Sequence, residues 1–380
     1  MDIPFKASPR ASLGIEVECG IVDRATRELT AAATDLLAEL GRDHPDGEHP
    51  KAKHELFECT IEIITGICGT VAEARADLEA TFAEVTPLTE KRGLALMCSG
   101  THPTSHWSGQ QISPDPRYAK LVEQIQWPAR RLAIHGIHFH VGVRSAAKAV
   151  AITNSLAFHL PIFLALSASS PFWHGMDTGM ASTRTKVFEG LPTAGLPPRL
   201  GDWSAFEMFM DTLIRAEAIK TIREVWWDVR PHPDFGTVEL RMCDGMSNLT
   251  EVTALAALAQ CLVHDLDTRL DDGGGPLPSG SDWVVKENKW LAARYGIDAR
   301  IIVDNTGTLR PVRAVIDDLV TRLEPTAREL GCAAELAEVP RIAERGPSYV
   351  RQRRMVDGGA SMTEVVDTLV AELAAGVPLP

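Results

Sequence analysis

Acidic and histidine side chains recur at two-residue spacing in this sequence, a spacing that places them on one face of a β-strand. Glu16 and Glu18 flank one apolar residue, and so do His138 and His140. Successive side chains of a strand point to opposite faces of the sheet. Two adjacent carboxylates repel each other, which favours a bound cation or a raised pKa. The pairs therefore predict side chains that face a ligand; the alternative is an ordinary strand with one solvated face.

A third stretch, 54–64, carries more carboxylates. Glu58 and Glu62 are four residues apart and share a face in either a strand or a helix. The β-branched residues around Glu62 favour a strand. Glu55 has the opposite parity, so we expect it to point away from this face.

Two predicted strands, 222–230 and 235–243, are joined by a Pro-His-Pro turn. In the second, Glu239 and Arg241 share a face. They form either a structural ion pair or a metal ligand beside a phosphate-binding guanidinium. Arg144 ends the strand of the two histidines and shares their face, which makes it a candidate for cofactor binding.

The segment 170–184 is rich in glycine, aromatic and hydrogen-bonding residues and has too little periodicity for a regular element. It suits either a substrate or nucleotide loop, with Asp177 and Arg184 as its best candidates, or a plain surface loop. Near the C-terminus, the basic cluster of Arg351, Arg353 and Arg354 indicates a solvated surface more than an anion site.

Composition narrows the class of protein. The 380 residues include 38 Lys and Arg and 51 Asp and Glu, a net charge of −13, which disfavours nonspecific binding to nucleic acid or anionic membranes. The N-terminus has no apolar signal core, and the apolar run 156–168 is too short to cross a bilayer. Seven dispersed cysteines suggest reduced thiols in the cytoplasm.

We expect an α+β protein. Residues 1–270 would form a sheet with helices that binds metal and nucleotide, the Gly/Pro-rich stretch 271–281 a linker or loop, and 282–380 a mainly helical part packed on the same domain. If the four polar strands join one antiparallel sheet, their carboxylates converge. Divalent cations would relieve that repulsion, and glutamate oxygens suit Mg²⁺ or Mn²⁺. Hard cations in a carboxylate-lined groove suggest phosphoryl transfer.

Taken in order, the motifs of the chain resemble a known family. They are Gly-Ile-Glu-Val-Glu, Glu58-x-x-x-Glu62-Ile, Gly-Ile-His-Phe-His-Val-Gly-Val, Trp-His-Gly-Met-Asp-Thr-Gly, Arg-Pro-His-Pro-x-Phe-Gly-Thr-Val-Glu-Leu-Arg and Glu-Asn-Lys-Trp-Leu-Ala-Ala-Arg-Tyr-Gly. Over residues 10–370 they are similar to carboxylate–amine ligases of the bacterial glutamate–cysteine ligase type 2 family.

The resemblance implies a glutamine-synthetase-like antiparallel sheet that forms a funnel for metal and ATP, backed by helices. Such enzymes phosphorylate a carboxylate, often the γ-carboxylate of glutamate, and an amine attacks the acyl phosphate. Arg241 would neutralise the phosphoryl group, Arg184 would be a second clamp, Arg294 would contact the nucleotide, and His140 would support a metal ligand. The metals would be held by Glu16, Glu18, Glu58, Glu62, His138 and Glu239.

The leading hypothesis is therefore an ATP- and Mg²⁺- or Mn²⁺-dependent ligase of small-molecule acids and amines, with a homodimer as the default assembly. One alternative is a dedicated glutamate–cysteine ligase. Another is a metal- or nucleotide-binding protein without turnover. A third, a metal hydrolase suggested by the His-x-His pair, lacks further His and Asp ligands in recognisable places.

Overall fold

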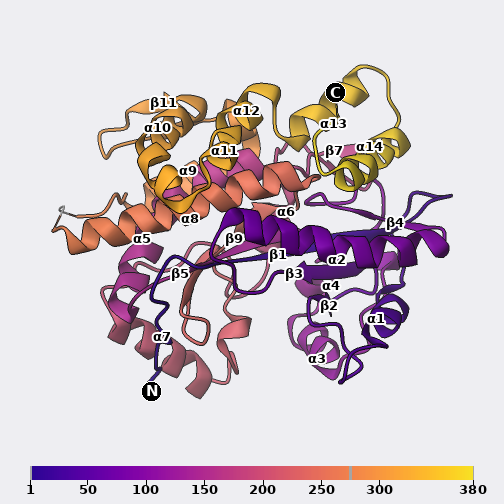
Figure 1. Cartoon of the computed structure of the whole chain (residues 1–380), viewed down its shortest axis with the longest axis horizontal. Coiled ribbons are helices and arrows are strands. Elements are labelled where there is room, and N and C mark those ends of the chain that lie inside the picture. Colours follow the sequence, from indigo (N-terminus) through magenta and orange to yellow (C-terminus); the bar gives the residue numbers. More distant parts are fainter. Residues whose placement is uncertain (1, 274–275, 380) are drawn as a thin grey trace.

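The structure is a computed structural model that describes residues 2–273 and 276–379, and a seven-stranded antiparallel sheet lies at its centre (Figure 1). Its strands are β1 (Leu13–Asp23), β2 (Ala52–His54), β3 (Thr60–Ile64), β4 (Leu94–Met97), β5 (Gly136–Gly142), β8 (Val229–His232) and β9 (Thr237–Asp244). The order across the sheet is β2-β3-β1-β5-β9-β8, and β4 pairs with the second half of β1. Two small hairpins are added, β6 (Phe172–Trp173) with β7 (Met176–Asp177) and β10 (Arg300–Ile302) with β11 (Leu309–Pro311).

The helices surround this sheet. They are α1 (Ala33–Gly41), α2 (Val71–Lys91), α3 (Pro116–Ile125), α4 (Trp127–Arg130), α5 (Ala146–Ser167), α6 (Thr183–Phe188), α7 (Trp203–Arg215), α8 (Leu249–Asp271), α9 (Asp282–Tyr295), α10 (Val312–Leu330), α11 (Ala333–Leu336), α12 (Glu338–Arg345), α13 (Ser348–Asp357) and α14 (Met362–Ala375). Short 3₁₀ turns occur at Trp107–Gly109, Ile222–Glu224 and Gly296–Asp298.

The alternation of β1 divides the two faces of the sheet. Leu13, Ile15 and Val17 are at most 1% exposed and belong to the main core, whereas Glu16 and Glu18 point to the opposite, partly exposed face. Burial of the apolar row drives this orientation, because a one-residue shift would exchange the two rows. The alternation predicted for this strand is confirmed.

Helices α5 and α8 pack on the apolar side of the sheet, and α8 separates it from α10, α11 and α12 (Figure 1). Both helices are long and apolar enough to cross a membrane by composition, but 83% of each apolar window is buried inside the protein. That environment is the one expected for core helices. On the opposite side of the sheet, Figure 1 shows α3 and α7.

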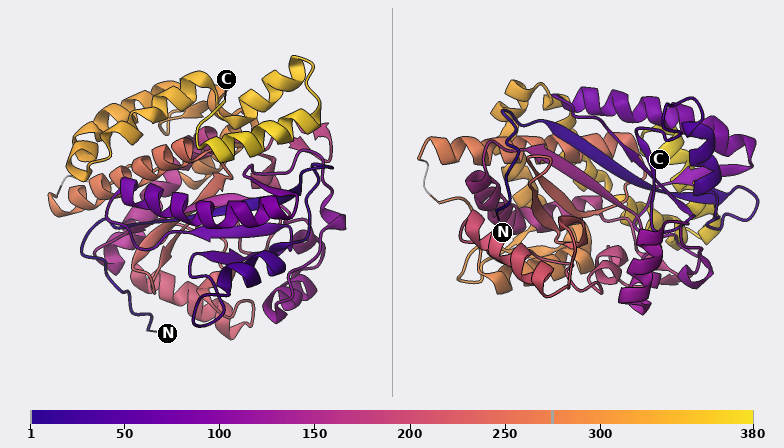
Figure 2. Two further views of the ribbon diagram at one scale, coloured as in Figure 1. Left: turned by 45° about the vertical axis from the view of Figure 1, so that its right-hand side comes forward. Right: turned by 90° about the horizontal axis from the view of Figure 1, so that it is seen from below.

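The C-terminal helices share the core of the sheet domain. One cluster of buried apolar residues includes Ile15 of β1 and both Ile316 and Leu323 of α10. The yellow helix α14 packs directly on β4. In the left view of Figure 2 the orange helices α10, α11 and α12 lie on the far side of α8 from the sheet, while the N-terminal segment runs beside α7. There the indole Nε1 of Trp203 donates a hydrogen bond to the carbonyl of Ile3 at 3.0 Å.

The strand predicted for residues 222–230 is wrong over most of its length. Residues 222–224 form a 3₁₀ turn, and β8 begins only at Val229. The strand then continues through Pro231 and His232, which we had placed in the turn. Arg230, inside β8, lies directly opposite Glu239 of β9.

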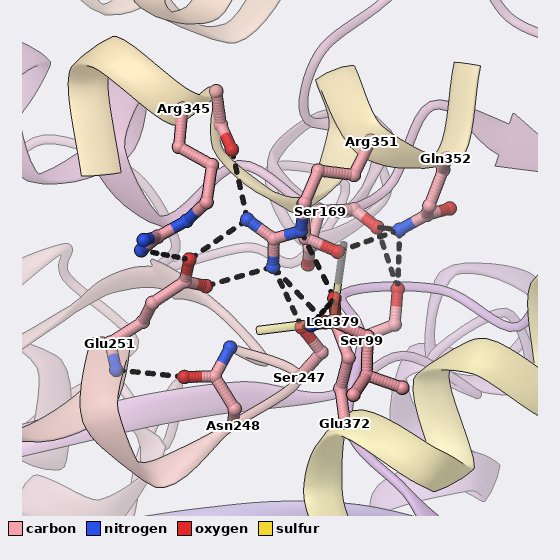
Figure 3. Close-up of polar contacts among 12 residues, drawn as sticks. Ser99, Ser169, Ser247, Asn248, Glu251, Arg345, Arg351, Gln352, Glu372 and Leu379 are labelled. Atoms are coloured by element: carbon pink, nitrogen blue, oxygen red, sulfur yellow. Dashed lines mark hydrogen bonds and ion pairs between the residues drawn. The ribbon is translucent and has the colours of Figure 1, made fainter. Parts of the chain in front are cut away.

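The solvated surface predicted for the basic cluster near the C-terminus is wrong for Arg351, which is 8% exposed (Figure 3). Its guanidinium donates to both carboxylate oxygens of Glu251 at 2.8 and 3.0 Å and to those of Glu372 at 3.1 and 3.0 Å. Periodicity on α13 did not indicate this contact because the partners come from α8 and α14. The network fastens the C-terminal helices to the core.

Replacement of Arg351 by Met should destabilise the protein by about 3–5 kcal/mol, because two buried carboxylates would lose their cation. The exposed Arg354 on the same helix is the matched control, and its replacement by Met should cost less than about 0.5 kcal/mol. Urea unfolding of the two variants measures the difference. Equal free energies of unfolding would contradict a structural role for the Arg351 network.

Candidate active site

Four carboxylates from three segments meet on the polar face of the sheet. In the pairing of β1 with β3, Glu18 lies directly opposite Glu62, and in the pairing of β1 with β5, Glu16 lies opposite His138. Glu55 joins them from the turn between β2 and β3. Glu16, Glu18, Glu62 and His138 therefore converge from distant parts of the chain, as the sequence predicts, whereas Glu55 joins them against the prediction.

Ligand atoms in this cluster approach one another within 4.8 Å in three overlapping sets. The sets are Glu16, Glu62 and His138; Glu18, Glu55 and Glu62; and Glu16, His140 and Glu239. Glu16 and Glu62 each belong to two of the sets. The three possible cation positions therefore share ligands and lie next to one another. Such spacing suits more than one divalent ion in a row.

Two of the carboxylates are destabilised in their charged form. Burial raises the pKa of Glu62 well above its usual value, and the nearby charges of Glu16, Glu55 and Glu18 add to the effect. Burial and the charge of Glu18 also raise the pKa of Glu55 to about 8. An excess of negative charge in a buried place is relieved by a cation, so this donor set fits hard divalent metals.

Glu16 behaves differently because histidines contact it. Burial alone would raise its pKa, but His140 and His138 outweigh burial and hold it well below the usual value. The Nδ1 atom of His138 lies 2.6 Å from one carboxylate oxygen and the Nε2 atom of His140 lies 3.1 Å from the other. Glu16 is therefore charged and fixed in orientation.

The two histidines differ in charge. Burial and the neighbouring Arg241 lower the pKa of His138, which leaves a neutral ring with a lone pair for a metal. Burial alone would lower the pKa of His140, but Glu239 and Glu16 raise it above the ordinary value. His140 also contacts the Thr237 hydroxyl at 3.1 Å. It therefore suits a supporting role behind Glu16, as the resemblance implies.

Glu239 is bracketed by two arginines. Arg230 Nε donates to Glu239 Oε2 at 2.6 Å, and Arg241 Nη1 donates to Oε1. Burial would raise the pKa of Glu239, but Arg230 and Arg241 keep it well below the usual value. A bulge between β5 and β9 sets two residues of β9, Arg241 and Met242, against His138. This bulge brings the Arg241 side chain beside the carboxylate cluster.

Arg184 reaches the same site from α6. Its side chain is buried, and a Cβ atom on Gly136 would lie 2.1 Å from its Nη2, so only glycine leaves room for it there. Its backbone N–H donates to Ser170 Oγ at 3.1 Å. Asp244, fully buried, accepts from the hydroxyls of Ser170 at 2.6 Å and Ser182 at 2.8 Å. These hydrogen bonds fix the backbone of Arg184 and thereby the position from which its guanidinium extends into the site.

These groups line one cavity of about 650 Å³. Its floor is the acidic cluster of Glu16, Glu18, Glu55, Glu62 and His138, with Arg184 and Arg241 beside it. Its wall is apolar and includes Leu121, Leu132, Leu191 and Trp226. In the part of the chain that the structure describes, the Nε atoms of Arg184 and Arg241 are buried and without a hydrogen-bond partner. A bound anion would supply one.

The structure does not bring Glu58 to the cavity. Residues 55–59 form a turn, and β3 begins only at Thr60. Glu58 therefore lies outside the strand, and the two-residue alternation no longer puts its side chain on the same face as Glu62. The Glu58 carboxylate instead accepts the Thr34 hydroxyl at 2.6 Å and the Thr34 backbone N–H at 3.2 Å. The same turn explains why parity wrongly excluded Glu55.

Three other predicted cofactor-binding residues lie elsewhere. Arg144 lies two residues beyond the end of β5 and forms ion pairs with Asp267 and Asp271 of α8. Asp177 accepts two hydrogen bonds from Arg353, at 3.1 and 2.6 Å. Arg294 donates to the carbonyl of Gly179. The last two contacts hold the loop that leads to α6, and so act on the position of Arg184 from a distance.

Sequence reasoning missed Arg230 as well as Glu55. Arg230 is the last residue of the strand predicted for 222–230, and its pairing with Glu239 becomes visible only from the β8–β9 register. Its Nη1 also donates to the carbonyls of Ile222 at 2.8 Å and Val225 at 2.6 Å.

Comparison with known proteins agrees with this geometry. The family model "Glutamate-cysteine ligase family 2(GCS2)" matches residues 12–372. The chain is 57% identical over 382 residues to a Frankia alni protein named "Putative glutamate--cysteine ligase 2-1", covering 100% of this chain and 99% of that one. It is 50% identical over 378 residues to the Thermobifida fusca "Putative glutamate--cysteine ligase 2", covering 100% of this chain and 94% of that one.

Solved structures share the fold at low sequence identity. The glutamate–cysteine ligase of Francisella tularensis in complex with AMP superposes with a TM-score of 0.71 at 11% identity, covering 98% of this chain and 89% of that one. A bifunctional glutathione synthetase from Pasteurella multocida gives a TM-score of 0.66 at 13% identity, covering 96% of this chain and 52% of that one. The glutamine-synthetase-like sheet is therefore confirmed. By its family model and its relatives, the chain belongs to glutamate–cysteine ligase family 2, and it is an ATP-dependent ligase that forms an amide.

Proposed function

We propose that the cavity is the active site, where ATP phosphorylates the carboxylate of a small acid, glutamate first, and an amine displaces the phosphate to form the amide. The single observation that carries this proposal is the meeting of four glutamates with two arginines, Arg184 and Arg241, whose Nε donors are buried and unpaired in one cavity. Carboxylates alone would suit a site that only binds cations, and arginines alone would suit a site that only binds anions. Phosphoryl transfer needs both next to each other.

In this proposal Mg²⁺ or Mn²⁺ is held by Glu16, Glu18, Glu55, Glu62 and His138. When bound, such ions would neutralise negative charge on the phosphate groups. Glu239 is nearby but already paired with Arg230 and Arg241, so we assign it to fixing Arg241 first and to metal binding second. The AMP in the Francisella tularensis complex supports nucleotide binding by the shared fold.

Arg241 and Arg184 are proposed to contact the transferring phosphoryl group and the acyl phosphate. Arg184 is buried and Arg241 is mostly buried, so their charge is weakly screened, and each keeps a buried Nε donor without a partner in the described residues. Localisation in the cytoplasm and assembly as a homodimer stay predictions from the sequence.

The direct test supplies purified protein with ATP, Mg²⁺, glutamate and a panel of amines that includes cysteine. ADP and a γ-glutamyl amide should appear in equal amounts by mass spectrometry. Product with cysteine alone would favour the dedicated glutamate–cysteine ligase, and product with several amines the broader ligase. ATP binding without ADP or amide from any amine would contradict the proposal and favour a binding protein without turnover.

Replacement of Glu62 by Gln should abolish turnover, because Glu62 belongs to two of the three ligand sets. The matched control is Glu58→Gln, four residues away, where the amide can still accept the Thr34 hydroxyl. We expect Glu58→Gln to keep activity close to the parent protein in the same ADP-release assay. Equal losses in both variants would contradict the placement of the metal site.

Replacement of Arg184 by Gln should lower kcat by roughly 10²–10³-fold, the range seen when one preorganised donor to a transition-state charge is removed. Arg144→Gln is the control, because Arg144 lies outside the cavity and pairs with Asp267 and Asp271. Steady-state kinetics with saturating ATP measure both. An unchanged kcat for Arg184→Gln would remove this residue from the proposed chemistry.

Metal binding should release protons near neutral pH. Glu55, with its pKa raised to about 8, is protonated at pH 7 in the metal-free protein, and a metal binds its charged form. Affinity for Mn²⁺ should therefore rise as pH increases toward about 8. Calorimetry in buffers of different ionisation enthalpy counts the protons released, and Glu55→Gln should lower that count. A count of zero in the parent protein would contradict the shared cation site.

A further inference from the structure

Four basic side chains surround the mouth of the active-site cavity. Arg117 and Lys120 come from α3, and Lys220 and Arg223 come from the segment after α7. All four are exposed, yet they line the same cavity as the partly buried carboxylates of the floor. Segments about a hundred residues apart in sequence therefore both bring exposed cations to the lining of one cavity.

These cations are not neutralised by the protein. Across residues 2–273 and 276–379, none of the four forms an ion pair with a carboxylate. The acid that also lines the mouth is Glu224, whose carboxylate accepts the backbone N–H of Lys220 at 3.0 Å. By contrast, the basic pair outside the cavity, Arg144 and Lys148, is matched by acids of α8.

Lys120 and Lys220 are close enough to disturb each other. The ammonium of Lys120 lies close to that of Lys220 and lowers its pKa, because two like charges repel each other. The chain has a net charge of −13, yet in its described residues Glu224 is the one acid that lines this cavity besides the four glutamates of the floor. An anion between the two ammonium groups would turn this repulsion into attraction.

The four cations of the mouth are exposed, whereas Arg184 and Arg241, which lie beside the acidic cluster, are largely shielded from solvent. The apolar wall of Leu121, Leu132, Leu191 and Trp226 lies in the cavity along with both charged regions. A ligand that reacts at the floor and extends to the mouth would meet positive charge at both ends. Its middle would pass an apolar surface, which favours hydrocarbon or ring atoms there.

We propose that Lys120 and Lys220 together bind an anionic group, a carboxylate or a phosphate, at the end of a ligand that lies remote from the reacting atom. The inference rests on the proposed function and adds a substrate class to it. At least one of the three substrates carries a negative charge that is recognised at the mouth and takes no part in the chemistry. Arg117 and Arg223 add to the field that attracts it.

The test is the double variant Lys120→Gln/Lys220→Gln, with Lys286→Gln as the matched control, since Lys286 is exposed on α9 outside the cavity. KM should rise about tenfold for the substrate whose anion binds at the mouth, with kcat retained, because two exposed charge contacts are lost. A rise confined to ATP assigns the anion to a phosphate, and a rise confined to the acid or the amine assigns it to that carboxylate.

Two amines that differ only in a carboxylate test whether the amine is the substrate that carries the anion. If the amine carries the anion, the double variant should lose its preference for cysteine over cysteamine, which lacks the carboxylate. Unchanged KM values for ATP, acid and amine would overturn the proposal. So would an equal effect of Lys286→Gln.

A binding measurement keeps this inference distinct from the proposed function. Inorganic phosphate, titrated into the metal-free protein, should bind about tenfold more weakly to the double variant than to the parent and the Lys286→Gln control. If no amine gives product, the proposed function fails, while this titration still tests the mouth. Equal phosphate affinity in all three proteins would overturn the proposal.

Discussion

Repulsion among partly buried carboxylates is the constraint on which the rest of the structure depends. Glu62 and Glu55 are held beside Glu16 and Glu18 in the lining of one cavity, where partial burial and like charges disfavour their charged forms. The antiparallel pairing of β1, β3 and β5 enforces this proximity, and the apolar rows on the opposite face provide the free energy that maintains it. A fold that tolerates such a cost in its metal-free form is adapted to bind cations.

The arginines are arranged around this constraint in two different ways. Arg230 is fully engaged with Glu239 and backbone carbonyls, which makes it part of the frame. Arg184 and Arg241 keep a buried donor free and face the cavity, so they are available to a ligand. The C-terminal helices contribute from outside the cavity, because Arg294 and Arg353 hold the loop that delivers Arg184. Removing those helices would therefore disturb the site without removing any residue from it.

The alternation of side chains along strands predicted much of this site, but the prediction was wrong for residues that lie beyond the strand ends. Along β1 and β5 the two-residue period correctly placed Glu16, Glu18 and His138 on one face. The alternation rule placed Glu55 and Glu58 on the wrong faces, because both residues belong to the turn at 55–59 and not to a strand. Sequence alone also could not show that Arg144 and Arg351 find acids on helices far along the chain. Long-range pairing of this kind depends on the packed fold, and local patterns carry no information about it.

The most direct test of the central claim is anomalous diffraction from crystals of the protein with Mn²⁺ and a nonhydrolysable ATP analogue. The account predicts manganese peaks on the cavity floor, with ligands drawn from Glu16, Glu18, Glu55, Glu62 and His138, and the terminal phosphate of the analogue within reach of Arg241. Manganese bound elsewhere, or a nucleotide whose phosphates avoid the floor, would contradict it.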